Sequence, residues 1–289
     1  MSLMYVFYHF PCNDGELAKI IWELKYPKSI FIKWNHMEAD IAIDFLNNIK
    51  EQSEIIFLDV CPSCILPSIH NYTVIDHHLN PINNMNKYIE KNNLTNVKML
   101  CDISKSGCML SWEYCYDKKK YPIIVHHIGN KDLWNFSDIN TEPYCIGYNN
   151  HLYANKYNRE YIIKSLLISD TTCYHEMFIS DGIKIIVDKI TLAEQYFLEK
   201  TLSIETVDNI NYNIMNINCD DSSMFKYLID YAAGEFINMD ILRILHTKKD
   251  NKTVYSLRSL KENIFVDGIA RKYGGNGHPK AAGYTLIDA

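Results

Sequence analysis

The sequence lacks the features of a membrane, secreted or duplex-binding protein. No apolar run approaches the roughly 18 residues that span a bilayer. The N-terminus lacks the cationic segment and long apolar core of a signal peptide. The formal net charge is −6, so strong non-specific binding to long duplex DNA through counterion release is not expected. We therefore expect a soluble cytoplasmic protein with no membrane partner, and any nucleic-acid partner should be short.

A disulfide or zinc-finger framework is also missing. The nine cysteines are an odd number, scattered from Cys12 to Cys219 in a chain large enough to fold without disulfide staples. Cys61 and Cys64 have the spacing of redox and zinc sites, but no second Cys or His pair follows at zinc-finger distance. Free thiols are therefore expected, and a structural zinc ion is the less favoured interpretation.

The pattern that is present alternates short apolar runs with helical periodicity. It predicts strands at residues 5–8, 30–34, 55–60 and 72–75, and helices at residues 16–22 and 39–49. Further helices are expected after Ser106, a suitable N-cap, and at about 122–128 and 181–200. Alternation of this kind predicts an α/β fold with a parallel sheet covered on both faces.

The 289 residues are enough for two domains, each with a core of its own. Residues 205–289 alternate strands with helices again and end in a glycine-rich run, without internal repeats or a low-complexity tail. We expect a first domain at 1–180, a helical connector at 181–200 and a smaller α/β domain at 201–289.

Polar residues gather where the predicted strands end. They occur at residues 9–14, at Asp59 and at residues 76–78. Because ligands of parallel sheets bind beyond the carboxyl ends of the strands, this edge is the predicted site.

Four aspartates would come together there: Asp14, Asp59, Asp76 and Asp132. So many carboxylates cannot share a pocket without cations or protons. Carboxylates mixed with imidazoles favour manganese, with magnesium, cobalt or zinc as alternatives. Two such ions would activate water and clamp a phosphoryl oxygen, which indicates phosphoester hydrolysis by metal-activated hydroxide.

The motifs resemble those of the DHH family of phosphoesterases with a C-terminal DHHA1 domain, and the resemblance spans nearly the whole chain. The N-terminal motifs are His9-Phe-Pro-Cys-Asn-Asp14-Gly15, Leu58-Asp59-Val60, Asp76-His77-His78 and Asp132-Leu133-Trp134, in the family's order. The DHHA1 motifs are Ser256-Leu-Arg258-Ser259 and the run from Gly274 to Gly283.

This resemblance implies a two-metal site in the cleft between the two domains. It implies that Asp59 bridges two ions, that His9 holds one, and that the other is held by Asp14, His77 and Asp132. By the same resemblance His78 and Asp59 are the catalytic residues, His78 facing the substrate while Asp76 orients an imidazole. The resemblance also implies that Arg258, His278 and the amides around Gly274, Gly275 and Gly277 bind the substrate.

The first motif departs from the family pattern. Cys12 stands where an aspartate is usual, and His9 lies one position closer to Asp14. A thiolate can bind a borderline metal such as zinc, and Asn13 could offer a neutral oxygen, so both ligands stay open. Asn276 replaces a glycine of the DHHA1 run, a minor change because Asn tolerates positive φ.

The resemblance predicts a metal-dependent phosphodiesterase or phosphohydrolase that acts on short oligonucleotides, cyclic dinucleotides or nucleoside bisphosphates. Two alternatives are a nucleotide-binding module that has lost turnover and an exopolyphosphatase. The substrate's identity and the oligomeric state, a homodimer included, stay open. A second pair, His126-His127, lies in an apolar helical context without a preceding Asp, and it is interpreted as packing or surface.

Overall fold

The computed structural model describes residues 3–35, 45–49, 51–62, 70–117, 120–154, 158–167, 172–248 and 252–287. The chain forms two compact units, Met1–Ile183 and Lys184–Ala289. The division falls within helix α8 (Thr172–Tyr196), which begins and ends earlier than the helix predicted at 181–200. The expected placement of the site between two domains stays a prediction.

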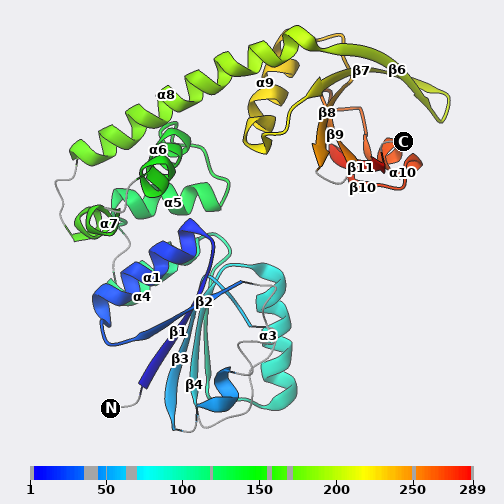
Figure 1. Cartoon of the computed structure of the whole chain (residues 1–289). Helices are drawn as coiled ribbons and strands as arrows, with labels where there is room; N and C mark the ends of the chain where they lie inside the picture. The colour runs from blue at the N-terminus through cyan, green and yellow to red at the C-terminus, as the bar shows by residue number, and fades with distance from the viewer. Residues whose placement is uncertain are drawn as a thin grey trace. The chain divides into compact units, whose positions relative to one another are not determined.

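The first unit contains a five-stranded sheet in which every pair of neighbouring strands is parallel, in the order β2-β1-β3-β4-β5 (Figure 1). The strands are β1 (Leu3–His9), β2 (Ile30–Trp34), β3 (Ser53–Leu58), β4 (Asn71–Asp76) and β5 (Val97–Cys101). The first four match the predicted apolar runs, so the parallel sheet is confirmed. The edge strand β5 was not predicted, because it has no fully buried residue and therefore only a weak apolar pattern.

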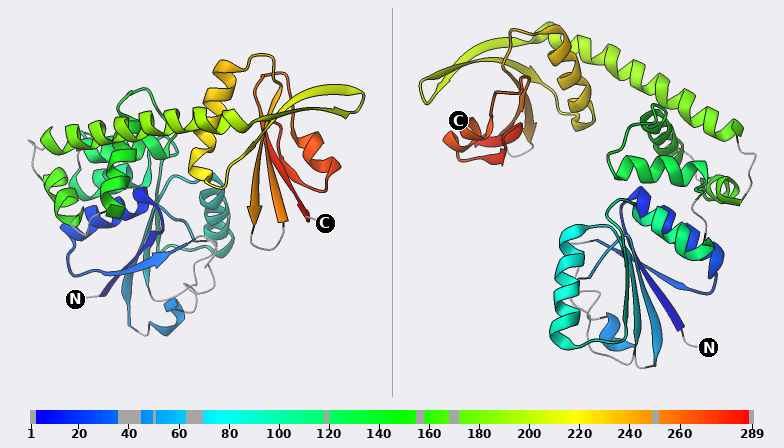
Figure 2. Two further views of the ribbon diagram at one scale, coloured as in Figure 1. Left: turned by 45° about the horizontal axis from the view of Figure 1, so that its top comes forward. Right: turned by 180° about the vertical axis from the view of Figure 1, so that it is seen from behind.

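Helices cover both faces of this sheet: α1 (Asn13–Lys25) and α4 (Gly107–Tyr116) lie on one face and α3 (Leu79–Asn92) on the other (Figures 1 and 2). Helix α5 (Ile123–Asp132) packs against α1 and α4, and α6 (Thr141–Ala154) and α7 (Asn158–Leu167) pack against α5. Successive residues of β1 point to opposite faces. Val6 packs in the core with α1 and α4, whereas Phe7 packs in a second core with Met85 of α3. The predicted α/β class is therefore confirmed.

Three helices differ from the sequence prediction. The helix predicted at 122–128 continues to Asp132, so that carboxylate ends a helix and does not lie in a loop. Helix α3 was not predicted, since only Ile82 and Met85 of its residues are fully buried among many asparagines. Most of the helix predicted at 39–49 lies outside the described residues, and residues 45–48 are helical.

The second unit is built on a six-stranded mixed sheet in the order β10-β11-β9-β8-β7-β6. Its strands are β6 (Thr201–Val207), β7 (Ile210–Asn218), β8 (Ile241–Lys248), β9 (Lys252–Ser259), β10 (Asn276–His278) and β11 (Ala281–Ile287). Its helices are α9 (Phe225–Glu235), α10 (Asp267–Lys272) and the short 3-10 helices η1 (Phe197–Glu199) and η2 (Ser222–Met224). Only β7 and β8 pair in parallel, and α9 connects them in a βαβ unit.

Two of the composition-based expectations can be compared with this fold. Within the described ranges no helix has both the length and the apolarity needed to cross a bilayer. Free thiols are present at Cys12, Cys61, Cys101, Cys108, Cys115, Cys145 and Cys219. The Cys61-Cys64 spacing cannot be followed further, because Cys64 lies outside the described residues.

Candidate functional site

The carboxyl ends of three neighbouring strands meet at one edge of the first sheet. His9 ends β1, Asp59 directly follows β3, and Asp76 ends β4. The amide of Asp59 still donates to the carbonyl of Ile75 at 2.9 Å, which keeps the residue beyond β3 in register with β4. The sheet order therefore brings together the polar residues that the sequence placed after separate strands.

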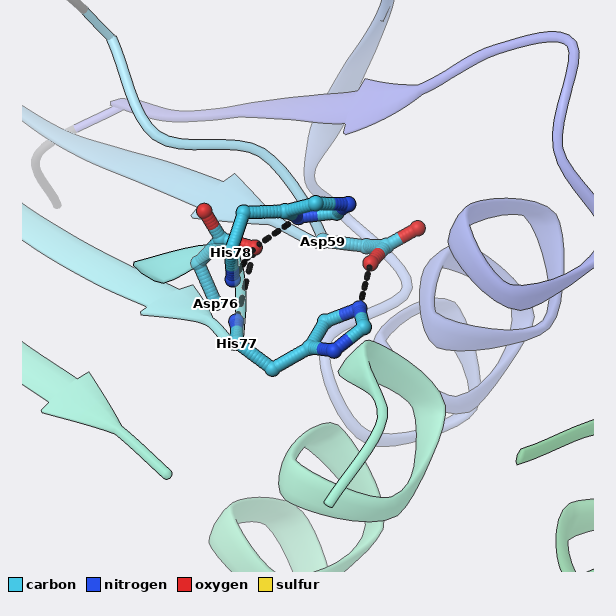
Figure 3. A group of neighbouring side chains, drawn as sticks. All are labelled: Asp59, Asp76, His77 and His78. Atoms are coloured by element: carbon cyan, nitrogen blue, oxygen red, sulfur yellow. Dashed lines mark hydrogen bonds and ion pairs between the residues drawn. The ribbon is translucent and has the colours of Figure 1, made fainter. Parts of the chain in front are cut away.

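Asp59 lies at the centre of this group and is 1% exposed. Its Oδ2 lies 3.2 Å from Nδ1 of His9. Its Oδ1 lies 3.2 Å from Nε2 of His77 (Figure 3). Burial would raise the pKa of Asp59, but its close contacts with the imidazoles of His77 and His9 outweigh burial and hold the pKa below the usual value. The backbone of Asp59 has φ 57°, a left-handed conformation that a non-glycine residue adopts at a cost in free energy.

His77 is held between two carboxylates. Its Nε2 lies 3.2 Å from Oδ1 of Asp59 and 3.1 Å from Oδ2 of Asp132. Burial lowers the pKa of His77, but the two carboxylates outweigh it and raise the pKa to about 10. A single ring nitrogen cannot satisfy both oxygens, and neither this nitrogen nor Oδ1 of Asp59 makes a hydrogen bond of regular geometry.

Asp14 is fixed by the N-terminus of helix α4. Its carboxylate accepts from the Ser106 hydroxyl at 2.8 Å, the Gly107 amide at 2.6 Å and the Cys108 amide at 3.1 Å. Ser106 is the N-cap residue of α4, as expected, but its side chain makes no capping hydrogen bond, because Asp14 satisfies these helix amides and also accepts the hydroxyl proton. Burial, followed by the charge of Asp59, raises the pKa of Asp14 well above its usual value.

Two glycines allow the backbone to approach these side chains, and the sequence analysis missed that role. A Cβ atom on Gly107 would lie 2.4 Å from Cβ of Asp59. A Cβ atom on Gly15 would lie 2.3 Å from the carbonyl oxygen of His9. The only sequence signal for Gly107 was its place at a helix start, where glycine has no particular advantage over other residues.

Asp76 and His78 form a pair beside this group. Asp76 is fully buried. Its Oδ1 lies 2.7 Å from Nδ1 of His78, and the same oxygen accepts a hydrogen bond from the backbone amide of His77 at 2.8 Å (Figure 3). The hydrogen bond with Asp76 raises the pKa of His78. A carboxylate on one ring nitrogen orients an imidazole, so Asp76 sets the direction in which His78 presents its other nitrogen.

Cys12 and Asn13, the two ligand candidates that the sequence left open, behave differently. Ligand atoms of Cys12, His9 and Asp59 lie within 4.8 Å of one another. Burial, followed by the charge of Asp59, raises the pKa of the Cys12 thiol to about 12. The Asn13 side chain donates an N–H of its Nδ2 to Oδ1 of Asn149 at 2.7 Å, which links it to helix α6.

The residues present fit divalent cations. A second group, made by Asp14, His77 and Asp132, also brings its ligand atoms within 4.8 Å of one another. Asp59 touches both groups, through Oδ2 on the His9 side and Oδ1 on the His77 side. Oxygen and imidazole nitrogen atoms are the usual donors for Mn²⁺ and related ions, and the unsatisfied atoms of Asp59 and His77 lie where a cation would be bound.

The substrate-binding residues predicted from the DHHA1 motifs all lie in the second unit. Arg258 in β9 is opposite Ala281 of β11, which is in turn opposite His278 of β10. Residues paired across antiparallel strands share a face of the sheet, so Arg258 and His278 flank a small alanine on one face. Arg258 is half-buried, burial lowers its pKa, and within the described part of the chain it makes no ion pair.

The glycine run is a hairpin of β10 and β11, and its amides are already used as donors. Gly274 donates to Arg271, Gly275 donates to Ala270, and the Gly277 amide donates to the side chain of Asn276. The prediction that these amides bind a substrate is therefore not supported. The run instead permits close packing, because a Cβ on Gly275 would lie 2.1 Å from the carbonyl oxygen of Gly283.

No family model matches the chain. A curated relative, protein R106 of Acanthamoeba polyphaga mimivirus, is 25% identical over 97% of this chain and 67% of that protein. Among solved structures, the pGpG-specific phosphodiesterase PggH of Vibrio cholerae is similar with a TM-score of 0.46 and 11% identity, over 99% of this chain and 93% of that one. An exopolyphosphatase-related protein of Bacteroides fragilis is similar with a TM-score of 0.40 and 14% identity, over 100% and 88% of the two chains. At these similarities, the function has to be argued from the site itself.

Proposed function

We propose that this chain is a metal-dependent phosphohydrolase that cleaves small nucleotide-type phosphoesters. The observation that carries the proposal is the position of Asp59, a buried carboxylate whose two oxygens each lie 3.2 Å from a different imidazole. A bridging carboxylate between two sets of ligands is the arrangement that two-metal phosphoester hydrolysis requires. The order of the six sequence motifs supports the same reaction class.

Each side of Asp59 has its own ligand residues. His9 would hold one divalent ion with Oδ2 of Asp59, and Asp14, His77 and Asp132 would hold the other with Oδ1. Manganese is the proposed ion, with magnesium, cobalt and zinc to be compared. When bound, the two ions supply an activated water and neutralise the charge that develops on the phosphoryl oxygens.

The protein's own acid is His78. Asp76 holds Nδ1 of His78 at 2.7 Å, which fixes the ring and leaves Nε2 as the nitrogen that gives a proton to the leaving oxygen. Asp76 would also stabilise the positive charge of the imidazolium before that transfer. His78 is about one third exposed, at 35% of its side chain, so substrate can reach it.

Substrate recognition is assigned to Arg258 and His278 of the second unit. A guanidinium matches the geometry of a phosphate with two parallel hydrogen bonds. Arg258 is suited to this because no ion pair within the described residues already occupies it. Contacts beyond the reacting phosphate favour a nucleotide over inorganic pyrophosphate as the substrate class.

The test measures hydrolysis by the protein after a chelator has removed its metal, with and without added divalent ions. Bis-p-nitrophenyl phosphate gives a generic readout, and a panel of di- and trinucleotides, cyclic dinucleotides, adenosine bisphosphate and polyphosphate identifies the substrate class. We expect hydrolysis to require added Mn²⁺ and to be highest on a nucleotide of the panel.

Two results would contradict the proposal. Nucleotide binding without release of product at any metal concentration would indicate a binding module. Release of phosphate from polyphosphate, with no cleavage of any nucleotide, would indicate an exopolyphosphatase. Arg258→Ala should raise KM for the preferred nucleotide, whereas Arg271→Ala, which removes an exposed arginine of the same unit, should not.

A further inference from the structure

Cys12 is the N-cap residue of helix α1, with φ −152° and ψ 133°. Its thiol interacts with the backbone amide of Gly15 but makes no regular capping hydrogen bond. Capping positions normally favour Ser, Thr, Asp or Asn, whose oxygen accepts from the first helix amides, and sulfur is a weaker acceptor. Helix stability alone therefore does not favour a cysteine at this position.

The surroundings of Cys12 point to a ligand. A cation on the His9 side of Asp59 would meet the imidazole of His9 and one carboxylate oxygen of Asp59. Ligand atoms of His9, Asp59 and Cys12 all lie within 4.8 Å of one another. Asp59 is 1% exposed, and the oxygen that faces this side, Oδ2, lies 3.2 Å from Nδ1 of His9. The NH2 group of the other candidate, Asn13, donates to Oδ1 of Asn149.

The two sides of Asp59 consequently differ in chemistry. The side of Asp14, His77 and Asp132 offers oxygen and nitrogen atoms, which suit Mn²⁺ and Mg²⁺. The side of His9 offers nitrogen, oxygen and sulfur. Thiolates bind zinc and similar borderline ions strongly and bind hard ions such as Mg²⁺ poorly.

We infer that the Cys12 thiolate is a ligand of the ion on the His9 side of Asp59 and makes that site selective for zinc-like or cobalt-like ions over magnesium. The inference rests on the proposed function, since it needs the two-metal centre. Binding replaces the S–H bond by a sulfur–metal bond and releases one proton to solvent, without any change of oxidation state. The chain would thus hold two ions of different kinds.

The experiment is a titration of metal-free protein with Co²⁺, followed by its absorption spectrum. A thiolate ligand gives a charge-transfer band in the near ultraviolet, whereas d–d bands in the visible report bound cobalt whatever the ligand. We expect a charge-transfer band for the wild-type chain at one ion per chain. Cys12→Ser and Cys12→Asp should lose this band and keep d–d bands. Cys219→Ser, in the second unit, should keep both.

A competition measurement gives the selectivity independently of activity. The preference for Zn²⁺ over Mg²⁺ should fall in Cys12→Asp by at least about tenfold, because even residues that only support a ligand change affinity by that much. Circular dichroism of each variant confirms that it is folded, and Cys12→Asp restores an oxygen donor should Cys12→Ser fold poorly.

The outcomes separate this inference from the proposed function. Visible d–d bands without a charge-transfer band, with an unchanged ion preference in Cys12→Asp, would overturn the role of Cys12 and leave the metal centre standing. Failure of the wild-type chain to bind any cobalt, zinc or manganese would overturn the proposed function, and the role of Cys12 with it.

Discussion

The chain contains two adjacent histidine pairs, and their surroundings are opposite. His77 and His78 follow strand β4, where His77 lies between Asp59 and Asp132 and His78 is held by Asp76. Burial alone would lower the pKa of His77. The carboxylates reverse that effect, and the pKa rises to about 10.

His126 and His127 lie within helix α5. His127 is buried, its ring packs on Tyr144 with centroids 4.4 Å apart, and its Nδ1 lies 3.2 Å from Oγ1 of Thr141. Burial, followed by the charge of His126, lowers the pKa of His127 to about 4. Ligand atoms of this pair and Asp138 lie within 4.8 Å of one another, but Asp138 and His126 are both more than one third exposed.

The comparison teaches that the carboxylates around a histidine pair, and not the pair itself, decide its chemistry. In a buried environment an unpaired charge is costly, so His127 stays neutral and packs as an aromatic ring. His77 is equally part of the interior, but it has two carboxylates as partners. We therefore expect metal-dependent chemistry at the first pair and a packing role for the second.

The largest effect is expected from Asp59→Asn. Asn tolerates the left-handed backbone of this residue, so the change removes charge without adding strain. Hydrolysis should fall by about 10³-fold, as when a group that stabilises the transition state directly is removed. Metal content, measured by atomic emission, should fall with it.

The matched change at the second pair is Asp138→Asn. It changes a carboxylate–imidazole contact that is exposed on both sides, with side chains 42% and 36% exposed, and should leave hydrolysis and metal content unchanged. A loss of one bound ion in this variant would break the comparison, because the second pair would then be a metal site too.

A smaller effect is expected from His78→Gln, which removes the proposed acid but none of the proposed ligands. The rate should fall by about 10²-fold, the lower range for the loss of an acid catalyst. Metal content should stay at the wild-type level, which separates this variant from Asp59→Asn. A substrate with a good leaving group such as p-nitrophenolate should be affected least. Equal losses on all substrates would contradict the acid role.

Gly107→Ala tests how closely the first pair's carboxylates are packed. The new Cβ would lie 2.4 Å from Cβ of Asp59, so either helix α4 or Asp59 must move. Overpacking of this kind costs about 1–3 kcal/mol of stability, and weaker metal binding should accompany it. The measurement is the urea midpoint together with the Mn²⁺ affinity.

A control for this change is Gly234→Ala in helix α9, where an added Cβ meets no atom within 4 Å. It should leave metal affinity unchanged and stabilise the chain by up to about 1 kcal/mol, because alanine is the better helix former. Unchanged metal affinity in both variants would show that Gly107 has no part in the site.

The smallest effect concerns the pH dependence of stability at the second pair. The pKa of His127 is about 4 in the folded chain, below the usual value near 6.5, so the unfolded chain binds the proton more readily. Stability should therefore be lost as the pH falls from about 6.5 towards 4, by roughly 2 kcal/mol at most between pH 7 and pH 5. His127→Phe should flatten this slope in urea unfolding, and an unchanged slope would assign the pH dependence elsewhere.

Much of the site could be predicted because its residues belong to contiguous motifs at the ends of apolar runs. The alternation of strands and helices fixes a parallel sheet, and in such a sheet the residues after β1, β3 and β4 have to share one edge. The sequence failed to predict the elements that have few buried residues. Strand β5 and helix α3 have few buried residues, so their apolar periodicity is faint.

The sequence by itself determined the donors of this protein: which carboxylates, imidazoles and thiols exist, and on which strand ends they stand. Tertiary structure alone decided what each donor faces. Asp14 meets the start of helix α4 more than ninety residues later in the chain, at Ser106 and Gly107, and Asp59 turns its two oxygens to different histidines. Local pattern cannot specify such contacts, because they depend on how distant elements pack and on the left-handed turn at Asp59. The charge state of a side chain follows from these contacts, which is why His77 and His127 differ although each belongs to a His-His pair.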